Sequence, residues 1–588
     1  MNKLEYKNLW DFIYLSSLRY SNNIALIYKQ KNQWKKETYK TFSQKVIKLS
    51  KGLREIGIRK GEKVAIYLPN SPEWMYFYLA VILNGGTCIP LDTKLGSTEL
   101  SHILKSSEAK YLIINGKGFC EKIPTILEKS HLEYIILVGR GFAQLPQMCK
   151  FISLEKSKKI SGLKRIFNHF KIKLPFTHEK KIKVIHHEEL FLDAENSNID
   201  IEESCLDDVA SIIYTSGTMG IPKGVMLTHR NFIANVLQIY PIIKSIKIKP
   251  ESKFLLILPL NHAYAFTANF LLPLSIGCSI VFIESYKKII ENAYETSPEV
   301  MIAVPLILEK IHKRLKKQIS ESKIKSFLFK FLFFKKIVGK KFKEKLGGKL
   351  IGIISGGAPL DPEICRDFND MGIMVLQGYG MTEASPVISV NPVEKIKCES
   401  VGPPLEGIEI KISNPNSGGV GELLVKGENV MKGYYNMPEE TEKVLKDGWL
   451  HTGDLAKIDE ENYIYIKGRK KTIIVNREGK NIYPEEVEFI LNHSAFILES
   501  LVLGYYEEGS IGEKVGAIIV PDMEYFEEYA KKNKINLTDE VIEKIIKEEV
   551  ARLTENIADY KKPRKIKIQM EPFQKTPTQK IKRTLYKF

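Results

Sequence analysis

A short polar segment, YTSGTMGIPKGVMLTHRN at residues 214–231, carries the residue types best suited to phosphate chemistry. It follows the apolar residues 210–214, which are typical of the end of a buried strand. Small residues let the backbone turn tightly around a ligand, while hydroxyls, backbone N–H groups and an ammonium bind phosphate oxygens. The residues expected to do this are Thr215, Ser216, Gly217, Thr218, Gly220 and Lys223. The segment predicts a polyphosphate site, with a spacing unlike the G-x-x-x-x-G-K-S/T loop.

Two further segments have the composition of a nucleotide site. Residues 375–386, VLQGYGMTEASP, place an aromatic ring, a hydroxyl and a carboxylate within five positions. This set suits stacking on adenine by Tyr379, a bond to the α-phosphate from Thr382 and binding of Mg²⁺ by Glu383. Earlier, in residues 350–360, Gly356 and Gly357 lack Cβ atoms, so a flat ring could lie against their backbone.

These segments resemble the motifs of the adenylate-forming superfamily, which holds acyl-CoA synthetases, adenylation domains of peptide synthetases and luciferases. The resemblance begins early, in KGEKVAIYLPNSPEW and AVILNGGTCIPLD, and continues through the YGxTE-like motif. Family members activate a carboxylic acid with ATP to an acyl-adenylate, and most then pass the acyl group to a thiol. Four motif sequences are most similar to those of bacterial long-chain fatty acid–CoA ligases: LPLNHAYAF, SGGAPL, GYGMTEASPVIS and VGPPLEGIEI.

The resemblance assigns roles to residues outside these segments. It places Asp454, in WLHTGD, on the ribose hydroxyls and Arg469 on the sugar–phosphate region of the nucleotide. It makes Lys471 the pivot of a domain hinge, and it makes Lys580 the lysine that bridges the substrate carboxylate and the α-phosphate. The further ATP-binding residues that it implies are Gly356, Gly357, Ala358, Gln377, Gly378, Tyr379, Gly380 and Met381. The sequence departs from the family pattern at Thr472, where many relatives carry Asp, and at Gln579, where glycine is usual.

His262 follows the apolar run 254–260, at the carboxyl end of a predicted strand. This end is where ligands bind in open α/β sheets. The resemblance places His262 beside the acyl-binding pocket. A histidine satisfied within the core is an equally good interpretation of the residue itself.

Alternating strand and helix patterns predict an α/β fold with a mostly parallel sheet. We expect a large amino-terminal domain, residues 1–470, of packed mixed sheets with helices and a β-rich subdomain. Residues 471–588 are expected to form a small, mobile α+β domain that carries Lys580. Two basic insertions, at about 140–190 and 313–346, interrupt the first domain.

Residues 323–346, KIKSFLFKFLFFKKIVGKKFKEKL, combine nine lysines with six phenylalanines. A basic amphipathic helix of this kind favours anionic lipid surfaces, with the aromatic face inserted and the lysines near the headgroups. The same pattern also fits a helix whose phenylalanines pack on the domain. Both interpretations stay open, so the segment predicts either a peripheral contact with an anionic membrane or a packed surface helix.

The charge balance of the 588-residue chain is 88 basic against 70 acidic side chains, a formal net charge of +18. Such a charge suits anionic substrates such as ATP and CoA, an anionic membrane or nucleic acid. The chain carries no nucleic-acid recognition motif, and its lysines are not interleaved with a base-stacking platform, so nucleic acid is not expected.

Seven scattered cysteines without a C-x-x-C pair argue against a disulfide framework and a zinc site. No signal peptide or spanning helix is expected, which predicts a cytoplasmic protein, peripheral at the inner face of the membrane.

The resemblance implies an AMP-forming acid–thiol ligase that uses ATP with Mg²⁺, a long-chain fatty acid and CoA. Acyl carrier protein is the alternative acceptor, because an acidic partner would suit the positive surface. An aryl or other acid–CoA ligase is a more distant alternative. A catalytically silent lipid-binding relative is disfavoured, because Lys223, Glu383, Asp454 and Lys580 are all present.

Overall fold

The computed structural model describes most of the chain as two units. The described residues are 6–126, 130–139, 153–156, 170–173, 182–191, 204–215, 222–320, 329, 331–478, 480–507, 512–575 and 581–588. The first unit comprises Met1–Cys398, Gly402–Glu409 and Lys426–Leu445, and the second comprises Glu399–Val401, Ile410–Val425 and Lys446–Phe588. The expected boundary at residue 471 and the mobility of the last domain stay predictions. Most of the predicted insertion at 140–190 lies outside the described residues.

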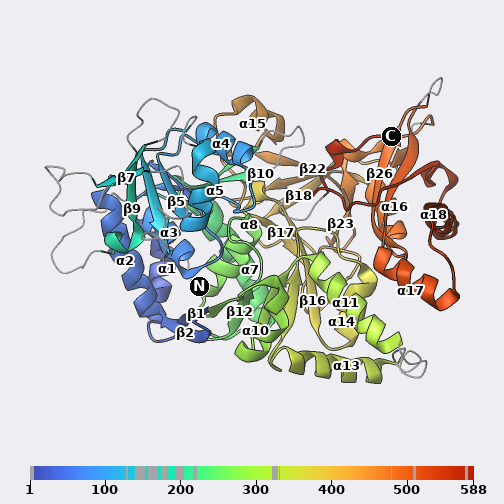
Figure 1. Cartoon of the computed structure of the whole chain (residues 1–588), viewed down its shortest axis with the longest axis horizontal. Helices are drawn as coiled ribbons and strands as arrows, with labels where there is room; N and C mark the ends of the chain where they lie inside the picture. The colour runs from blue at the N-terminus through green and yellow to red at the C-terminus, as the bar shows by residue number, and fades with distance from the viewer. Residues whose placement is uncertain are drawn as a thin grey trace. The chain divides into compact units, whose positions relative to one another are not determined.

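A ten-stranded sheet forms one layer of the first unit (Figure 1). Its strands in spatial order are β20 (Gly433–Tyr434), β11 (Lys223–Thr228), β10 (Val209–Thr215), β4 (Thr87–Pro90), β3 (Lys63–Tyr67), β5 (Tyr111–Asn115), β6 (Tyr134–Val138), β9 (Lys183–His186), β8 (Phe170–Lys173) and β7 (Ser153–Lys156). The strands from β10 to β9 pair in parallel, and β11 and β20 extend one edge antiparallel to their neighbours. In the β10–β11 hairpin, Thr215 pairs with Lys223, so the predicted polyphosphate segment connects two neighbouring strands.

An eight-stranded sheet carries the other predicted nucleotide segments. Its order is β17 (Val387–Val390), β16 (Met374–Gly380), β15 (Gly352–Ser355), β14 (Val300–Ala303), β12 (Lys253–Leu256), β13 (Ser279–Phe282), β1 (Ile24–Gln30) and β2 (Gln33–Thr38). The six strands between the two edges pair in parallel, while β17 and β2 run antiparallel. The carboxyl ends of parallel strands meet at one edge, which brings together the segments after β12, β15 and β16. The predicted α/β class with mixed sheets is confirmed.

Helices cover these sheets (Figure 1). They are α1 (Leu9–Arg19), α2 (Tyr39–Glu55), α3 (Pro72–Leu83), α4 (Ser97–Ser106), α5 (Gly116–Ile126), η3 (His187–Leu190), α7 (His229–Ser245), α8 (Ala263–Ala265), η5 (Phe266–Leu271), α9 (Leu272–Ser275), η6 (Tyr286–Lys288), α10 (Ile289–Thr296), α11 (Pro305–Ser320), α13 (Leu332–Lys345), α14 (Pro362–Asp370), η7 (Thr382–Ala384) and α15 (Pro438–Val444). Local capping fixes where several begin. The Thr38 hydroxyl accepts from the Thr41 N–H at 3.2 Å, so α2 begins directly after Thr38.

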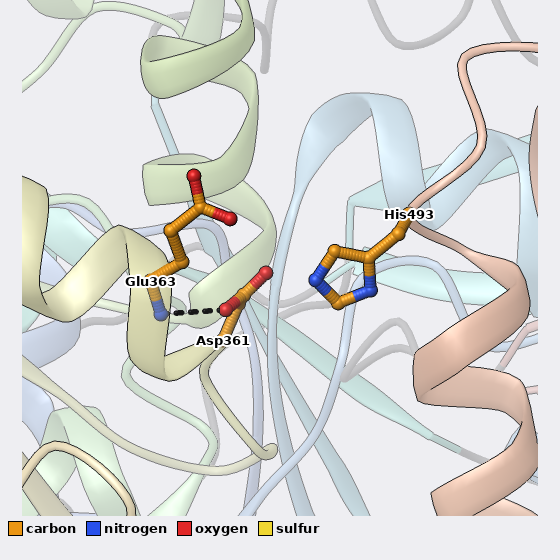
Figure 2. Close-up of side chains that lie close together, drawn as sticks. All are labelled: Asp361, Glu363 and His493. Carbon is orange, nitrogen blue, oxygen red and sulfur yellow. Dashed lines mark hydrogen bonds between the residues drawn. The ribbon is translucent and has the colours of Figure 1, made fainter. Parts of the chain in front are cut away.

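Helix α14 shows the same kind of cap. The Asp361 carboxylate accepts from the Glu363 N–H at 2.7 Å, at the start of the helix (Figure 2). Helix α14 contacts both α11 and α13 (Figure 1). His493, also drawn in Figure 2, belongs to the second unit, where its Nδ1 lies 2.7 Å from the Phe489 carbonyl oxygen.

The second unit is rich in β-structure. Its strands are β18 (Glu409–Ser413), β19 (Gly421–Lys426), β21 (Leu445–Lys446), β22 (Trp449–Ile458), β23 (Ile464–Arg469), β24 (Ile474–Val475), β25 (Asn481–Ile482), β26 (Ile497–Tyr505), β27 (Lys514–Pro521) and β28 (Lys565–Ile568). Its helices are η8 (Lys470–Thr472), α16 (Pro484–Leu491), α17 (Met523–Asn533), α18 (Asp539–Leu553), η9 (Asp559–Lys561) and η10 (Arg583–Leu585). The sheet of β26, β27 and β28 packs α16, α17 and α18 around a core that includes Val487, Phe526 and Ile546. The expected β-rich part and α+β part are both present.

The cysteines correct one expectation. Cys365 in α14 and Cys398 form a disulfide with their Cα atoms 5.7 Å apart. Their 33-residue separation places them in different elements, so spacing along the chain could not reveal the pair. No helix in the described ranges is long and apolar enough to cross a bilayer.

Candidate functional site

Lys223 begins β11 and contacts a carboxylate and an aromatic ring. Its ammonium forms an ion pair with Glu440 of α15 and lies 4.9 Å from the ring centroid of Tyr434. Hydrogen bonds from Lys223 and then Lys443 lower the pKa of Glu440 to about 2, so this carboxylate is charged at neutral pH. The adjacent predicted residues Ser216, Gly217, Thr218 and Gly220 lie outside the described residues. Thr215, which is described, ends β10 directly opposite Lys223.

Tyr434 connects Lys223 with Glu383. Strand β20 pairs with β11 so that Tyr434 lies opposite Val225, two residues after Lys223 and therefore on the same face of the sheet. The Tyr434 hydroxyl donates to Oε1 of Glu383 at 2.9 Å. Burial first, and then the Glu383 charge, raise the pKa of Tyr434, which keeps the phenol protonated as a donor. The structure thus links the predicted phosphate lysine with the predicted magnesium ligand.

Backbone contacts fix the two segments that meet here. Glu383 lies in η7, directly after β16, and Thr382 begins the same short helix. The Met431 N–H donates to the Glu383 carbonyl at 2.8 Å, and the Asn429 amide donates to the Ala384 carbonyl at 2.8 Å. The chain that continues into β20 is therefore held against η7. A carboxylate in this position is the oxygen ligand that Mg²⁺ prefers, so Glu383 fits the expected metal.

The glycines of the GYG motif serve strand pairing. A Cβ at Gly380 would lie 1.9 Å from the Pro386 carbonyl oxygen, and one at Gly378 would lie 3.1 Å from that of Ser389. These glycines let β16 approach β17, which follows a turn through η7. Gln377 is buried and its amide donates to the Cys398 carbonyl at 2.5 Å. Tyr379 and Met381 are half-buried around this turn.

The glycines after β15 lie next to an aromatic ring. A Cβ at Gly356 would lie 3.2 Å from Cζ of Tyr264, whose hydroxyl donates to the Ile354 carbonyl at 3.1 Å. Gly357 has a φ of +84°, which favours glycine, and Ala358 is exposed beside it. Gly356 is thus needed for the close approach of Tyr264, and the exposed backbone of the next two residues is what a ligand could contact.

His262 lies beyond β12 and faces Asp92. Its Nε2 is 3.8 Å from Oδ2 of Asp92, and neither atom has a hydrogen-bond partner among the described residues. Although 26% of the His262 side chain is exposed, Nε2 itself is buried. Burial lowers the pKa of His262, and the Asp92 charge opposes this shift in part, which favours a neutral ring. The pocket role of His262 stays a prediction.

The second unit places two further predicted residues together. Asp454 in β22 pairs with Arg469 in β23, and Nε of Arg469 lies 2.8 Å from Oδ1 of Asp454. Asp454 is buried, while the Arg469 side chain is 49% exposed. Lys471 lies in η8, directly after Arg469, and the Thr472 hydroxyl donates to Glu485 at 3.1 Å. The antiparallel pairing of β22 and β23 therefore brings together Asp454 and Arg469, which are fifteen positions apart in the chain.

Lys580 lies outside the described residues. The residues that flank its segment, Lys575 and Ile581, form an antiparallel bridge, and the Lys582 N–H donates to the Gln574 carbonyl at 2.9 Å. Phe573 is buried against Leu501 and neighbouring apolar residues. The base of the segment is thus anchored on the second unit's sheet.

Three residues of these clusters were not singled out from the sequence: Tyr434, Glu440 and Asp92. Tyr434 and Glu440 lie in KGYYNMPEE, which reads as an ordinary turn with aromatic and acidic residues. Their partners are distant, since Glu440 is 217 positions from Lys223. The aromatic pair beside a proline–glutamate turn is the signal that could have drawn attention to this segment.

The chain is similar in sequence to known proteins over most of its length. The AMP-binding enzyme family matches residues 16–435. Long chain acyl-CoA synthetase 3 of Arabidopsis thaliana is 30% identical over 571 residues, covering 90% of this chain and 80% of that protein. The chloroplastic long-chain-fatty-acid–acyl-carrier-protein ligase AEE15 of the same plant is 26% identical over 657 residues, covering 99% and 85%.

A solved structure shares the fold. The crystal structure of the anthranilate CoA ligase AuaEII in complex with anthranoyl-AMP superposes with a TM-score of 0.74 at 19% identity, covering 99% of this chain and 96% of that one. This likeness shows the fold, while the family match over most of the chain and the 30% identical relative show the family. The chain belongs to the AMP-binding enzyme family.

Proposed function

We propose that this enzyme activates a long-chain fatty acid with MgATP to an acyl-adenylate, releases pyrophosphate, and transfers the acyl group to CoA to give acyl-CoA and AMP. The observation that carries the proposal is the cluster of Lys223, Tyr434 and Glu383, in which Tyr434 connects an ammonium with a carboxylate that lies just after β16. The relative named a long chain acyl-CoA synthetase supports the choice of substrates.

The residues divide the work between charge stabilisation and positioning. Lys223, with Thr215 and the hydroxyls of Ser216 and Thr218, holds the leaving pyrophosphate. Mg²⁺ would neutralise phosphate charge, and Glu383 would hold it, with Thr382 on the α-phosphate. Asp454 accepts from the ribose hydroxyls, and Arg469 contacts the sugar–phosphate region. Lys580 bridges the acid and the α-phosphate, and rotation about Lys471 then removes it.

The first test measures AMP release from ATP and Mg²⁺ with a ladder of fatty acids, each with CoA or with holo-acyl carrier protein. We expect release to be greatest with long chains, because each methylene that an acyl-binding pocket buries contributes roughly 0.8 kcal/mol of binding free energy. We also expect release to require CoA as the acceptor. A set of aryl acids of equal concentration serves as the control. Turnover with the aryl acids alone would reject the fatty-acid proposal.

Acyl carrier protein is the alternative acceptor. The relative AEE15 is named a ligase for this acceptor, and the net charge of +18 would favour an acidic carrier. The two acceptors are separated by the same assay, since AMP release that depends on holo-carrier and not on CoA would assign the enzyme to this alternative.

The proposed setting is cytoplasmic, with a peripheral contact to an anionic membrane through α13. One side of α13 packs against the rest of the first unit, where Phe342 is buried. The Lys335 ammonium lies 2.8 Å from the carboxylate of Asp367 and 2.9 Å from that of Asp370. A Cβ at Gly339 would lie 1.9 Å from the Met371 carbonyl oxygen, so the helix packs closely at this point. The packing alternative therefore describes this side of the helix.

The start of α13 and its other side expose large apolar residues: Phe331 precedes the helix and Leu332 begins it, while Phe333 and Ile337 lie on the other side. The exposed fractions are 51% for Phe331, 52% for Leu332, 70% for Phe333 and 38% for Ile337. Lys336, Lys340 and Lys341 are exposed on the same helix. Each lysine near an anionic surface contributes about 1 kcal/mol, and the aromatic rings can enter the headgroup boundary. This combination supports an anionic bilayer as the partner of these exposed apolar residues.

Replacing Phe331, Leu332, Phe333 and Ile337 by serine is expected to reduce binding to vesicles containing phosphatidylglycerol about tenfold or more, because buried apolar area is lost. Vesicle sedimentation measures this, with pure phosphatidylcholine as the uncharged comparison. The matched control is Leu15→Ser with Leu18→Ser, which removes exposed leucines from α1. Equal binding by the variant and the native chain would reject this contact, and unchanged AMP release would show that the variant is folded.

A further inference from the structure

Glu440 is held next to Lys223 by the local structure of α15. The Thr441 hydroxyl accepts from the Tyr434 N–H at 2.9 Å and donates to the Met437 carbonyl at 2.9 Å. This ties the first turn of α15 to β20, which itself pairs with β11. The carboxylate of Glu440 consequently reaches the ammonium of Lys223 on one side and that of Lys443 on the other.

The pair lies at partly exposed positions. The Lys223 side chain is 24% exposed and that of Glu440 is 33% exposed. Glu440 is charged at neutral pH, since the neighbouring ammonium groups keep its pKa low. A partly exposed ion pair between a lysine and a carboxylate contributes little free energy and can be exchanged for another anion. The polyphosphate of ATP carries more negative charge than one carboxylate and is a stronger partner for the same ammonium.

We propose that Glu440 is an internal counter-ion for Lys223. When ATP binds, its β- and γ-phosphates replace Glu440 as the partner of the Lys223 ammonium, and Glu440 pairs with the ammonium again as pyrophosphate leaves. The inference rests on the proposed role of Lys223 in binding pyrophosphate. It assigns Glu440 to the release of the leaving group. The carboxylate lowers the affinity for ATP and for pyrophosphate together, and so keeps the product from remaining bound.

Tyr434 complements this exchange as a positioning residue. Its ring faces the Lys223 ammonium and needs no counter-ion to do so, so this contact persists when the carboxylate is displaced. Its hydroxyl remains on Glu383 at 2.9 Å. Tyr434 therefore keeps the lysine near the carboxylate proposed to bind Mg²⁺ in both states of the exchange.

The test compares Glu440→Gln with the matched control Glu439→Gln, an exposed carboxylate one position earlier. Calorimetric titration of the full chain uses MgATP, magnesium pyrophosphate and AMP, without any acid. We expect Glu440→Gln to bind MgATP and pyrophosphate roughly two- to fivefold more tightly, to leave AMP binding unchanged, and to lose this difference at high salt. Glu439→Gln is expected to match the native chain.

Unchanged or weaker binding of MgATP and pyrophosphate to Glu440→Gln would overturn the inference, as would an equal gain for AMP. A second measurement uses Tyr434→Phe, which keeps the ring and removes the hydroxyl. This variant is expected to raise the Mg²⁺ concentration needed for half-maximal ATP binding, and an unchanged Mg²⁺ midpoint would remove Tyr434 from the scheme. Because these titrations need no carboxylic acid, they stand even if no fatty acid is activated, and the AMP-release assay reports that failure separately.

Discussion

Replacing Lys580 by alanine is expected to slow acyl-adenylate formation by about 10²–10³-fold, the effect of removing one group that stabilises charge in a transition state. In the proposed reaction, the ammonium of Lys580 lies where the acid carboxylate attacks the α-phosphate and negative charges are crowded. Transfer from preformed acyl-adenylate to CoA follows the proposed rotation that withdraws Lys580, so this half-reaction should keep nearly the native rate. Single-turnover assays of each half-reaction measure the two rates separately.

The matched control for this variant is Lys587→Ala, which removes an exposed lysine from the same carboxyl-terminal segment. It should leave both half-reactions at the native rate. An equal loss of both half-reactions in Lys580→Ala would contradict the assignment, because the residue would then act in both states of the enzyme or support the fold. Denaturant unfolding of the variant separates this second case from a catalytic effect.

The fold was predictable because the local signals agree with the global arrangement. The Pro72–Leu83 helix follows a serine cap and is apolar on most faces, as a helix buried between layers should be. Strands such as β3 and β4 are short apolar runs without alternation, which is typical of parallel strands covered on both sides. Alternation of such strands with helices leaves few arrangements other than parallel sheets.

The contacts of the site depend on pairings that no local pattern reveals. Lys223 and Glu383 were expected in one site from the resemblance, yet Tyr434 and Glu440, which connect and balance them, lie in a segment with ordinary turn composition. Strand β20 has two residues, too few for a periodic signal, and its pairing with β11 decides where Tyr434 points. The His262–Asp92 and Cys365–Cys398 pairs were also missed, because the two partners of each pair are far apart in the chain and no local pattern relates them.

Helix α13 shows why the two interpretations of a basic, aromatic segment could not be separated by sequence. Its Phe342 is buried and its Phe333 is 70% exposed, although both are phenylalanines of the same basic, aromatic segment. The difference arises from α14, whose carboxyl end lies against Gly339 and receives one side of the helix. Periodicity indicates that a helix has two faces, whereas only the neighbouring elements decide which face is covered.

Replacing Glu383 by glutamine is expected to lower the rate of adenylate formation on the order of 10²-fold and to raise the Mg²⁺ concentration that gives half-maximal rate. Glutamine keeps an oxygen that can accept from the Tyr434 hydroxyl, so the local packing should persist while the negative charge is lost. The matched control is Glu428→Gln, an exposed carboxylate in the segment that leads to β20. If Glu383→Gln slows the reaction without moving the Mg²⁺ midpoint, the residue supports the site through Tyr434 and does not hold the metal. Partial recovery of the rate at high Mg²⁺, seen for Glu383→Gln and absent for Glu428→Gln, is the result that the proposed role requires.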